Sequence, residues 1–347
     1  MFKQCRVLVT GAGSGVGQGI IKALRLSTLP VKIVASDISH LNAGLYRAEE
    51  AIVIPKVEID GALDIIIKLL KKHRINVVMI GSEFDLTFFS TNKIEIESRT
   101  KAIIVVAPPQ TIAVANDKWL TTKFLEANNL PYARAHLPED IDEAILTSKS
   151  WGYPIVLKAR QGTSSRHVHV VENSKKLKEL YHAIPMPMLQ RLIDIPTSEI
   201  RNEYTCSIFK AVDGSFIGPF TARRTLRGGT SWNIEVSNFE QLKEPLLSIA
   251  SAIDCPGSLN VQLMLTDDGP IPFELNARFS GTTAVRAHFG FNEPEMALLS
   301  YFYNKSITKP KIGCGVALRY HEEVFVENES SSSLSTGLHK GVVNPWF

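Results

Sequence analysis

The chain has 347 residues, of which 44% are hydrophobic, 21% charged and 8% aromatic. One hydrophobic core rarely serves so long a chain, so we expect two or three domains, and the composition excludes disordered and membrane-embedded classes. The net charge of +3 at pH 7 is too small to indicate nucleic-acid binding. The four cysteines lack paired or metal-ligand spacing and predict reduced thiols: Cys5, Cys206, Cys255 and Cys314.

The first residues lead into a β-rich run without the apolar core and cleavage site of a secretory signal. No apolar run reaches the roughly 20 residues of a membrane span. We therefore expect a cytoplasmic protein whose partners are small molecules rather than nucleic acid or membrane.

Residues 1 to about 110 alternate short β-branched runs with amphipathic helical patterns. The expected strands are 6–10, 32–37, 76–81 and 102–108, and the expected helices are 17–27, 61–73 and a segment after Asp85. Such alternation predicts βαβ units around a parallel sheet, an α/β fold. The prolines of "APPQT", residues 107–111, end this region.

The pattern then changes to that of an α+β region. Helices are expected at 116–128, 139–150, 175–182, 238–253 and 293–304. Mostly antiparallel strands are expected at 154–159, 167–171, 188–193, 203–209, 215–224, 260–266 and 271–277. A last strand at 316–326 precedes a Ser-rich run, 327–337, that is typical of a loop or loosely held tail.

A glycine-rich turn follows the first strand in "VLVTGAGSGVGQG". Its glycines Gly11, Gly15 and Gly17 fit the TGxxxGxG spacing and resemble those of short-chain NAD(P)-dependent oxidoreductases, and Asp37 stands where an acid holds a ribose hydroxyl. The alternative is that the glycines only permit close strand–helix packing, in which case the turn is expected to line the acceptor side of a cleft elsewhere.

The oxidoreductase interpretation requires a Tyr-xxx-Lys pair, in which lysine lowers the pKa of the phenol. The match, Tyr301 and Lys305, lies far outside the Rossmann-like region, at the end of a predicted helix. The Rossmann-like region therefore lacks the Tyr-xxx-Lys pair that hydride transfer in this class of oxidoreductase requires.

The stretch 257–281 predicts two strands joined by the turn "TDDGP". Glu274 and Asn276 are two apart and share one face, Gln262 lies on the preceding strand, and Arg278 continues the same face. Carboxylate and amide oxygens with substrate phosphates suit Mg²⁺, and an arginine there can stabilise a transferring phosphoryl group.

The order N-x-Q … E-x-N-x-R, which starts at Asn260, resembles the metal-binding end of the ATP-grasp superfamily and is most similar to the large subunit of carbamoyl-phosphate synthase. The resemblance implies a Rossmann-like pre-ATP-grasp domain at 1–110 followed by a two-lobed ATP-grasp fold at 111–308, with a mobile lid at about 118–187. Residues 309–347 would form the C-terminal strand and tail. With one ATP-grasp unit and no glutaminase segment, carbamoyl-phosphate synthesis itself is not expected.

The same resemblance implies an ATP site with Mg²⁺, or Mn²⁺ in its place, bound by Gln262, Glu274 and Asn276. Lys118 and Lys158 would hold phosphates. Adenine and ribose would be met by further predicted residues: Gln190, the backbone of Leu192, and Glu203, with Glu199 as a substitute for Glu203. Closure of the loop 160–166 would use Arg160 or Arg166.

The implied activity is that of an ADP-forming carboxylate–amine ligase working through an acylphosphate, with Arg278 and Lys158 as catalytic residues. The arginines of "TARRTLRGGTSWN", Arg223, Arg224 and Arg227, are expected to shape the acceptor pocket for an acidic small substrate, or else to form a basic exposed hairpin.

Glu83 and Asp85, just past a strand end, are substrate candidates or first-turn helix acids, and Arg286 is a weaker candidate. The alternative functions are the NAD(P)-dependent oxidoreductase and a catalytically silent ATP-binding protein of the same fold. Many members of the family are dimers, so a homodimer is an open expectation.

Overall fold

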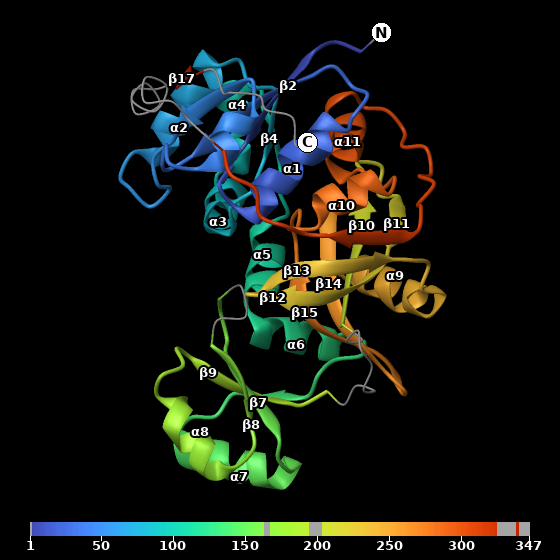
Figure 1. Ribbon diagram of the computed structural model, residues 1–347. Helices are drawn as coiled ribbons and strands as arrows, with labels where there is room; N and C mark the ends of the chain where they lie inside the picture. The colour runs from blue at the N-terminus through green and yellow to red at the C-terminus, as the bar shows by residue number, and fades with distance from the viewer. Residues whose placement is uncertain (1, 163–166, 194–202, 325–337, 340–347) are drawn as a thin grey trace.

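The computed structural model describes residues 2–162, 167–193, 203–324 and 338–339, and it shows an α/β part followed by antiparallel sheets (Figure 1). The first sheet has the parallel strand order β3-β2-β1-β4-β5, with the short β17 antiparallel at its edge. Its strands are β1 Cys5–Val9, β2 Val31–Asp37, β3 Glu50–Val53, β4 Val77–Met79, β5 Ile103–Val105 and β17 Leu338–His339. The predicted parallel α/β sheet is confirmed.

Helices connect the parallel strands, as βαβ units require. They are α1 Gly15–Arg25, α2 Ala62–Lys72, α3 Glu83–Thr91 and α4 Lys93–Thr100. The Ser14 hydroxyl accepts the Gly17 N–H and so caps α1, whose buried Ile20 and Leu24 face the core. Helix α3 begins at Glu83 rather than after Asp85, so both acids lie in its first turn.

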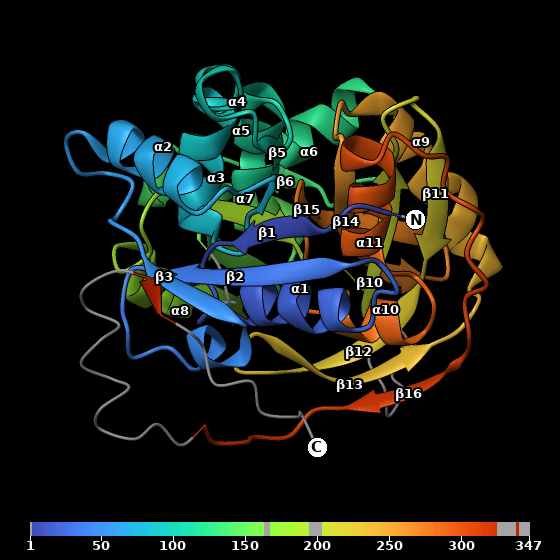
Figure 2. The same cartoon turned by 90° about the horizontal axis from the view of Figure 1, so that it is seen from above.

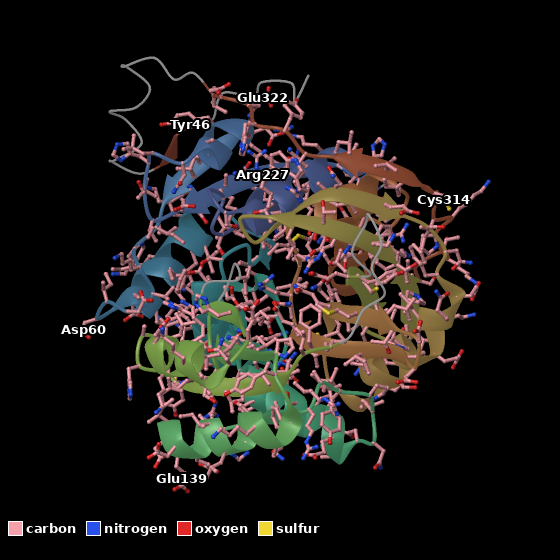
Figure 3. All side chains as sticks on the ribbon, turned by 60° about the horizontal axis from the view of Figure 1, so that its bottom comes forward. Tyr46, Asp60, Glu139, Arg227, Cys314 and Glu322 are labelled. Carbon is pink, nitrogen blue, oxygen red and sulfur yellow. The ribbon has the colours of Figure 1, made fainter. Side chains whose placement is uncertain are left out.

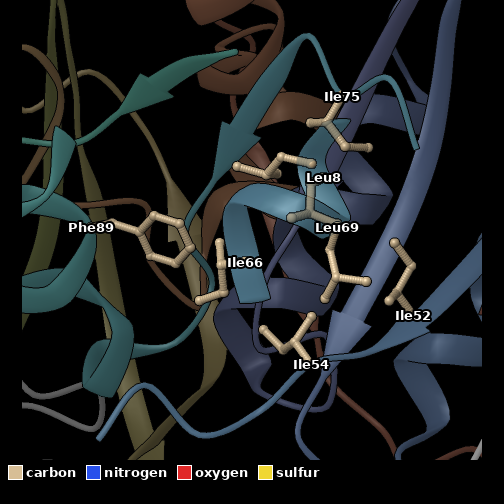
Figure 4. A pocket seen from close by; sticks show the side chains of 8 residues that line it. Leu8, Ile52, Ile54, Ile66, Leu69, Ile75 and Phe89 are labelled. Carbon is tan, nitrogen blue, oxygen red and sulfur yellow. The ribbon is translucent and has the colours of Figure 1, made fainter. Parts of the chain in front are cut away.

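Apolar side chains from α2, α3 and the sheet leave a void of about 10 Å³ (Figure 4). Leu8, Ile66 and Phe89 are among its lining residues, and all of these are apolar. A void this small and dry is a packing defect of the core rather than a ligand site.

Two consecutive helices follow the first sheet. They are α5 Pro109–Asn116 and α6 Lys118–Ala127, and Asp117 caps α6 by accepting the N–H groups of Trp119 and Leu120. The sequence did not predict α5, because its prolines were interpreted only as an end signal, whereas Pro109 occupies the first turn of the helix.

A small antiparallel sheet with the order β6-β9-β7-β8 forms the part at the bottom of Figure 1. Its elements are β6 Ala135–His136, α7 Ile141–Trp151, β7 Ile155–Ala159, β8 Val168–Val171, α8 Ser174–Tyr181 and β9 Pro187–Arg191. Its own core runs from Ala144 to Leu189. Helix α6 contacts β6 of this sheet but also α5 and β15, and its Leu125 belongs to the larger core. The lid boundaries at about 118–187 stay a prediction.

A large antiparallel sheet has the order β15-β14-β10-β12-β13-β16, with β11 also paired to β10. Its strands are β10 Glu203–Lys210, β11 Phe216–Phe220, β12 Ala222–Arg227, β13 Thr230–Val236, β14 Gly257–Thr266, β15 Gly269–Asn276 and β16 Gly315–Leu318. The helices are α9 Lys243–Ala252, α10 Thr283–His288 and α11 Glu293–Ala297, continued by a π-helical turn at Leu298–Phe302.

Two predicted strands differ in this region, and one observed strand was not predicted. The single strand expected at 215–224 is divided at Thr221, whose hydroxyl donates to the Ser237 carbonyl and fixes a corner. Strand β13, at 230–236, was not predicted as a strand, and the expected last strand at 316–326 is shortened to β16. Residues 325–326 and the Ser-rich run 327–337 lie outside the described residues.

The first sheet and the large sheet share a hydrophobic core. Val78 and Ile104 of the first sheet belong to the same core as Leu259 of β14, and α1 packs against α10. Figure 2 shows β16 along the outer edge of the large sheet, on the side where α1 and α10 lie. The junction between the sheets is therefore a packed interface, and it positions the site described next.

Candidate active site at the junction of the two sheets

A cavity of about 320 Å³ lies where the first sheet meets the large sheet. Its lining comes from the turn before α1, from the start of α3, and from β10, β12, β14 and β15. Ser14, Gly15 and Val16 of the glycine-rich turn belong to this lining. Predicted site residues from both parts of the chain meet here: Glu83, Arg224, Gln262, Glu274 and Arg278.

The three predicted metal ligands lie together on β14 and β15. The strands pair with Gln262 opposite Glu274 and Asn260 opposite Asn276, which confirms the hairpin and its shared face. One oxygen of Glu274 accepts hydrogen bonds from the amides of Gln262 at 3.2 Å and Asn276 at 2.9 Å. The residues are thus assembled as predicted, and their role as ligands stays a prediction.

Among the described residues there is no group of three or more His, Cys, Asp or Glu side chains placed to hold a metal ion. An ion bound at Glu274 would therefore depend on the amide oxygens and on substrate phosphates, which is how Mg²⁺ is commonly held with few protein carboxylates.

Arg224 links this set to Glu203. Its guanidinium forms a buried ion pair with Glu203 at 2.7 Å, and it donates to the Gln262 oxygen at 2.6 Å and to the Ser231 hydroxyl at 3.0 Å. Glu203, predicted to hold ribose, therefore contacts Arg224 and lies beside the proposed metal ligands. The substitute candidate Glu199 lies outside the described residues.

The other two arginines of the predicted cluster do not line the cavity. Arg223 alternates to the opposite face of β12 and pairs with Glu235 at 2.6 Å. Arg227, labelled in Figure 3, is exposed at the end of β12. Its guanidinium lies over the Trp232 ring. Of the three, Arg224 is the one that reaches the site.

Glu83 and Arg278 face each other across the cavity, with 3.4 Å between Oε2 and Nη2. This ion pair joins α3 of the first sheet to the end of β15. Asp85, in the first turn of α3, is 7% exposed, and burial raises the pKa of its carboxyl to about 6, while a hydrogen bond from Thr10 opposes the shift. Asp85 is not part of the cavity lining.

Lys158 is the buried cation of the predicted ATP site. It is 5% exposed, and its ammonium donates to the Gln190 side-chain oxygen from the neighbouring strand β9. Burial, and to a smaller extent the nearby charge of Lys118, lower the pKa of Lys158 to about 7, and Glu274 opposes this shift. A buried ammonium with a neutral partner and a cationic neighbour fits a polyphosphate anion.

Lys118, a second predicted phosphate-binding residue, lies within electrostatic reach of Lys158. The Lys118 ammonium donates to the Gly162 carbonyl at 2.9 Å, and Arg160 forms an ion pair with Asp117 at 2.6 Å. These two contacts connect the start of α6 with the loop after β7. Leu192, just after β9, is 37% exposed. Arg166 lies outside the described residues.

The glycine-rich turn is a packing element. A Cβ on Gly17 would lie 2.2 Å from the Gly11 carbonyl oxygen, and one on Gly11, whose φ is +56°, would lie 2.6 Å from Ser82. Asp37 accepts the N–H groups of Gly13 and Ile38, both at 2.8 Å, so both of its oxygens serve the protein. These contacts favour the packing interpretation over a dinucleotide cradle.

Tyr301 and Lys305 do not form a catalytic pair. The Tyr301 hydroxyl donates to the Lys210 carbonyl at 2.7 Å and accepts the Gly257 N–H at 3.0 Å. Burial raises the pKa of Tyr301 to about 12, the opposite of what proton transfer near neutral pH requires.

Arg286, a weaker candidate, is fully buried beneath the cavity. It pairs with the equally buried Glu293 at 3.1 Å, and it donates to the side-chain oxygens of Asn260 and Thr205, which line the cavity. Arg286 therefore supports residues of the cavity lining and is not itself part of that lining.

Sequence reasoning missed one cation of the cavity, Arg319, just after β16. It stood in a predicted strand without any motif, and no spacing related it to the hairpin. Three hydroxyl residues of the lining, Ser231, Ser280 and Thr282, were also not predicted. The sequence signal that could have indicated these hydroxyl residues is their position next to glycine and arginine, in 227–231 and 278–281.

Two stretches of the sequence match protein families. Residues 7–105 match the family described as PylC-like, N-terminal domain, and residues 115–282 match the ATP-grasp domain. The chain is 24% identical over 310 residues to phosphoribosylamine–glycine ligase of Pyrococcus horikoshii, a match that covers 81% of this chain and 68% of that protein.

The predicted likeness to carbamoyl-phosphate synthase is distant. The chain is 22% identical over 302 residues to the large chain of that enzyme from Methanothrix thermoacetophila, which covers 80% of this chain and 28% of that protein.

Among solved structures, N5-carboxyaminoimidazole synthetase from Staphylococcus aureus in complex with ADP has a TM-score of 0.70 at 15% identity, covering 90% of this chain and 80% of that one. This structural likeness extends through both sheets of the fold. Residues 115–282 therefore match an ATP-grasp domain, and a PylC-like N-terminal domain precedes it at residues 7–105.

Proposed function

We propose that this protein is an ATP-dependent ligase that phosphorylates a carboxylate and joins the resulting acylphosphate to an amine, releasing ADP and phosphate. The observation that carries the proposal is the continuity of the site. The buried Lys158 ammonium lies within electrostatic reach of Glu274, and Glu274 lines a cavity of about 320 Å³ that Arg278 and Glu83 also line. Phosphate-binding and acceptor-binding groups are thereby adjacent.

Each residue has a separate task in this reaction. Lys118 and Lys158 hold the phosphates of ATP, with Gln190 orienting Lys158. Gln262, Glu274 and Asn276 would hold Mg²⁺, which offsets the phosphate charge when bound. Arg278, paired with Glu83 at 3.4 Å, can turn to the oxygens of the acylphosphate as they gain charge.

The name of one relative, phosphoribosylamine–glycine ligase, describes the joining of an amine with glycine, which supports carboxylate–amine chemistry for this chain.

The experiment is ADP release over a panel of amino acids, dipeptides and other carboxylates, with and without added amines. Glu274→Ala and Lys158→Ala are expected to reduce ADP release by roughly 10²–10³-fold, as loss of a preorganised charge does in other enzymes. Asp268→Ala, on the exposed turn of the same hairpin, is the matched control and should retain wild-type activity.

The outcomes separate the alternatives. A Mg-ATP-dependent thermal shift without ADP release from any acceptor would identify a silent ATP-binding protein. Enhanced NADH fluorescence without a Mg-ATP shift would favour the oxidoreductase. Activity that survives both Glu274→Ala and Lys158→Ala would show that the site is assigned to the wrong residues.

A further inference from the structure

Arg319 contributes a positive charge to the cavity from the segment that follows β16. It lies outside both matched stretches, 7–105 and 115–282. Its backbone N–H donates to the Trp232 carbonyl at 3.1 Å, so the segment is held alongside β13. The side chain donates one hydrogen bond, to the Gly281 carbonyl, and its Nε is buried without a hydrogen-bond partner.

The charge of Arg319 is not compensated within the part of the chain that the structure describes. The other two guanidinium groups that line the cavity are paired, Arg224 with Glu203 at 2.7 Å and Arg278 with Glu83 at 3.4 Å. Arg319 has no described carboxylate within 4.0 Å. A partly buried cation without a counter-ion favours an anionic ligand in the adjoining space.

Neighbouring charges strengthen this preference. Burial lowers the pKa of Arg319, and the positive charge of Arg319 in turn helps burial to lower the pKa of Lys22 on α1. Glu322 opposes the shift of Lys22, and this acid pairs with Arg47 at 3.3 Å. Arg319 therefore lies close enough to a second cation, Lys22, for their charges to repel, and an anion bound at Arg319 would offset this repulsion.

The cavity has open room for such a ligand near α1. A Cβ on Gly15, the first residue of α1, would meet no atom within 4 Å, and the first turn of this 11-residue helix contains no acidic residue. The positive end of the helix dipole adds to the attraction that Arg319 exerts on an anion. Helix and guanidinium thus favour the same kind of group.

We propose that Arg319 binds an oxyanion group, a carboxylate or a phosphate, on the small-molecule substrate and so determines substrate specificity. This inference rests on the proposed ligase function, in which the reacting carboxylate lies at Arg278 and Glu274. The oxyanion at Arg319 is a second group that takes no part in bond making. A cavity of about 320 Å³ has the size for a small substrate with both groups.

Binding is measured first, independently of turnover. The protein with saturating Mg-ADP is titrated with probes that carry two oxyanion groups, aspartate, glutamate and phosphoserine, and with asparagine and glutamine, in which the second group is a neutral amide, and thermal shifts are recorded. Wild type should bind members of the carboxylate or phosphate set and discriminate against the amides. Arg319→Gln should weaken that binding at least ~30-fold, and Arg319→Lys should restore part of it, because lysine keeps the charge and loses the planar fork.

Three controls keep the result interpretable. Lys311→Gln removes an exposed positive charge from the same segment and should bind like wild type. Mg-ATP binding should be unchanged in Arg319→Gln, which shows that the variant is folded. In turnover, Arg319→Gln should raise KM for the oxyanion substrate far more than it lowers kcat.

The inference is overturned if Arg319→Gln binds the probes with wild-type affinity, if amides bind as tightly as acids, or if no oxyanion probe binds wild type. Binding that depends on Arg319 without any ADP release rejects the ligase and retains the inference. ADP release that is insensitive to Arg319→Gln retains the ligase and rejects the inference.

Discussion

Arg224 and Gln262 are joined by a hydrogen bond of 2.6 Å from the guanidinium Nη2 to the amide oxygen. The same oxygen is the atom that the proposed metal site requires of Gln262. An amide oxygen has two lone pairs, so Arg224 fixes its orientation while one lone pair remains for an ion. Because Arg224 also pairs with Glu203, the alignment of Gln262 depends on a buried ion pair between β10 and β12.

Replacing Arg224 by lysine tests this alignment. A lysine ammonium keeps the charge but cannot reach Glu203, Ser231 and Gln262 with the geometry of a planar fork. Loss of a group that orients a metal ligand typically costs 10- to 100-fold, so we expect ADP release to fall by about that factor and the Mg²⁺ requirement to rise.

The adjacent Arg223 supplies the control for this variant. It lies on the other face of β12 and pairs with Glu235, so Arg223→Lys should leave the Mg²⁺ titration unchanged. Equal effects of the two substitutions would mean that Arg224 does not orient Gln262.

The alternation of faces along β12 was available from the sequence, because side chains in a strand point to opposite faces at successive positions. It separates Arg224 from Arg223, although the sequence alone does not say which face is inside. The shared face of Gln262, Glu274 and Asn276 was predicted for the same reason, and the structure adds the register that places Gln262 opposite Glu274.

Contacts between distant segments could not be predicted in this way. Arg319 reaches the cavity because β16 adds to the edge of the large sheet beside β13, and no local pattern specifies a partner so far away in the chain. The ion pair of Glu83 with Arg278 likewise depends on how the two sheets pack together. Local periodicity predicts strands and faces, and the packing of sheets decides which faces meet.

The lowered pKa of Lys158 predicts that ATP binding is accompanied by the uptake of a proton. Burial lowers the pKa of its ammonium to about 7, and the phosphates of ATP would raise that pKa. At pH 8 about nine-tenths of the free sites are then neutral and must take up a proton, whereas at pH 6 most already carry it. ATP affinity should therefore fall as pH rises from 7 to 9, approaching tenfold per pH unit.

Calorimetry in buffers of different ionisation enthalpy measures this uptake directly. Lys158→Arg is the control, because arginine stays protonated throughout this range and should bind ATP without proton uptake. Uptake by wild type that equals uptake by Lys158→Arg would place the titrating group elsewhere.

Gly15 and Gly17 separate the two roles of the glycine-rich turn. A Cβ on Gly17 would lie 2.2 Å from the Gly11 carbonyl oxygen, whereas one on Gly15 meets open space. Gly17→Ala forces the backbone of the turn to move and should reduce the free energy of unfolding by about 2–4 kcal/mol. Gly15→Ala should change it by less than ~1 kcal/mol, because alanine is the better helix former. Urea unfolding of both variants measures the difference, and a stable Gly17→Ala would contradict the packing role.

The raised pKa of Asp85 predicts that the free energy of unfolding depends on pH. Burial raises the pKa of its carboxyl from 3.8 to about 6, so the folded protein holds this proton more tightly than the unfolded chain. The stabilisation from the protonated form is complete below pH 4 and is lost as pH rises through 6. Between pH 4 and pH 8 the wild type should lose about 2–3 kcal/mol of unfolding free energy as Asp85 ionises. Asp85→Asn should not show this loss, because the amide does not ionise. Asp60→Asn, at an exposed acid of the same region (Figure 3), should follow wild type throughout, and parallel curves for Asp85→Asn would show that Asp85 titrates normally.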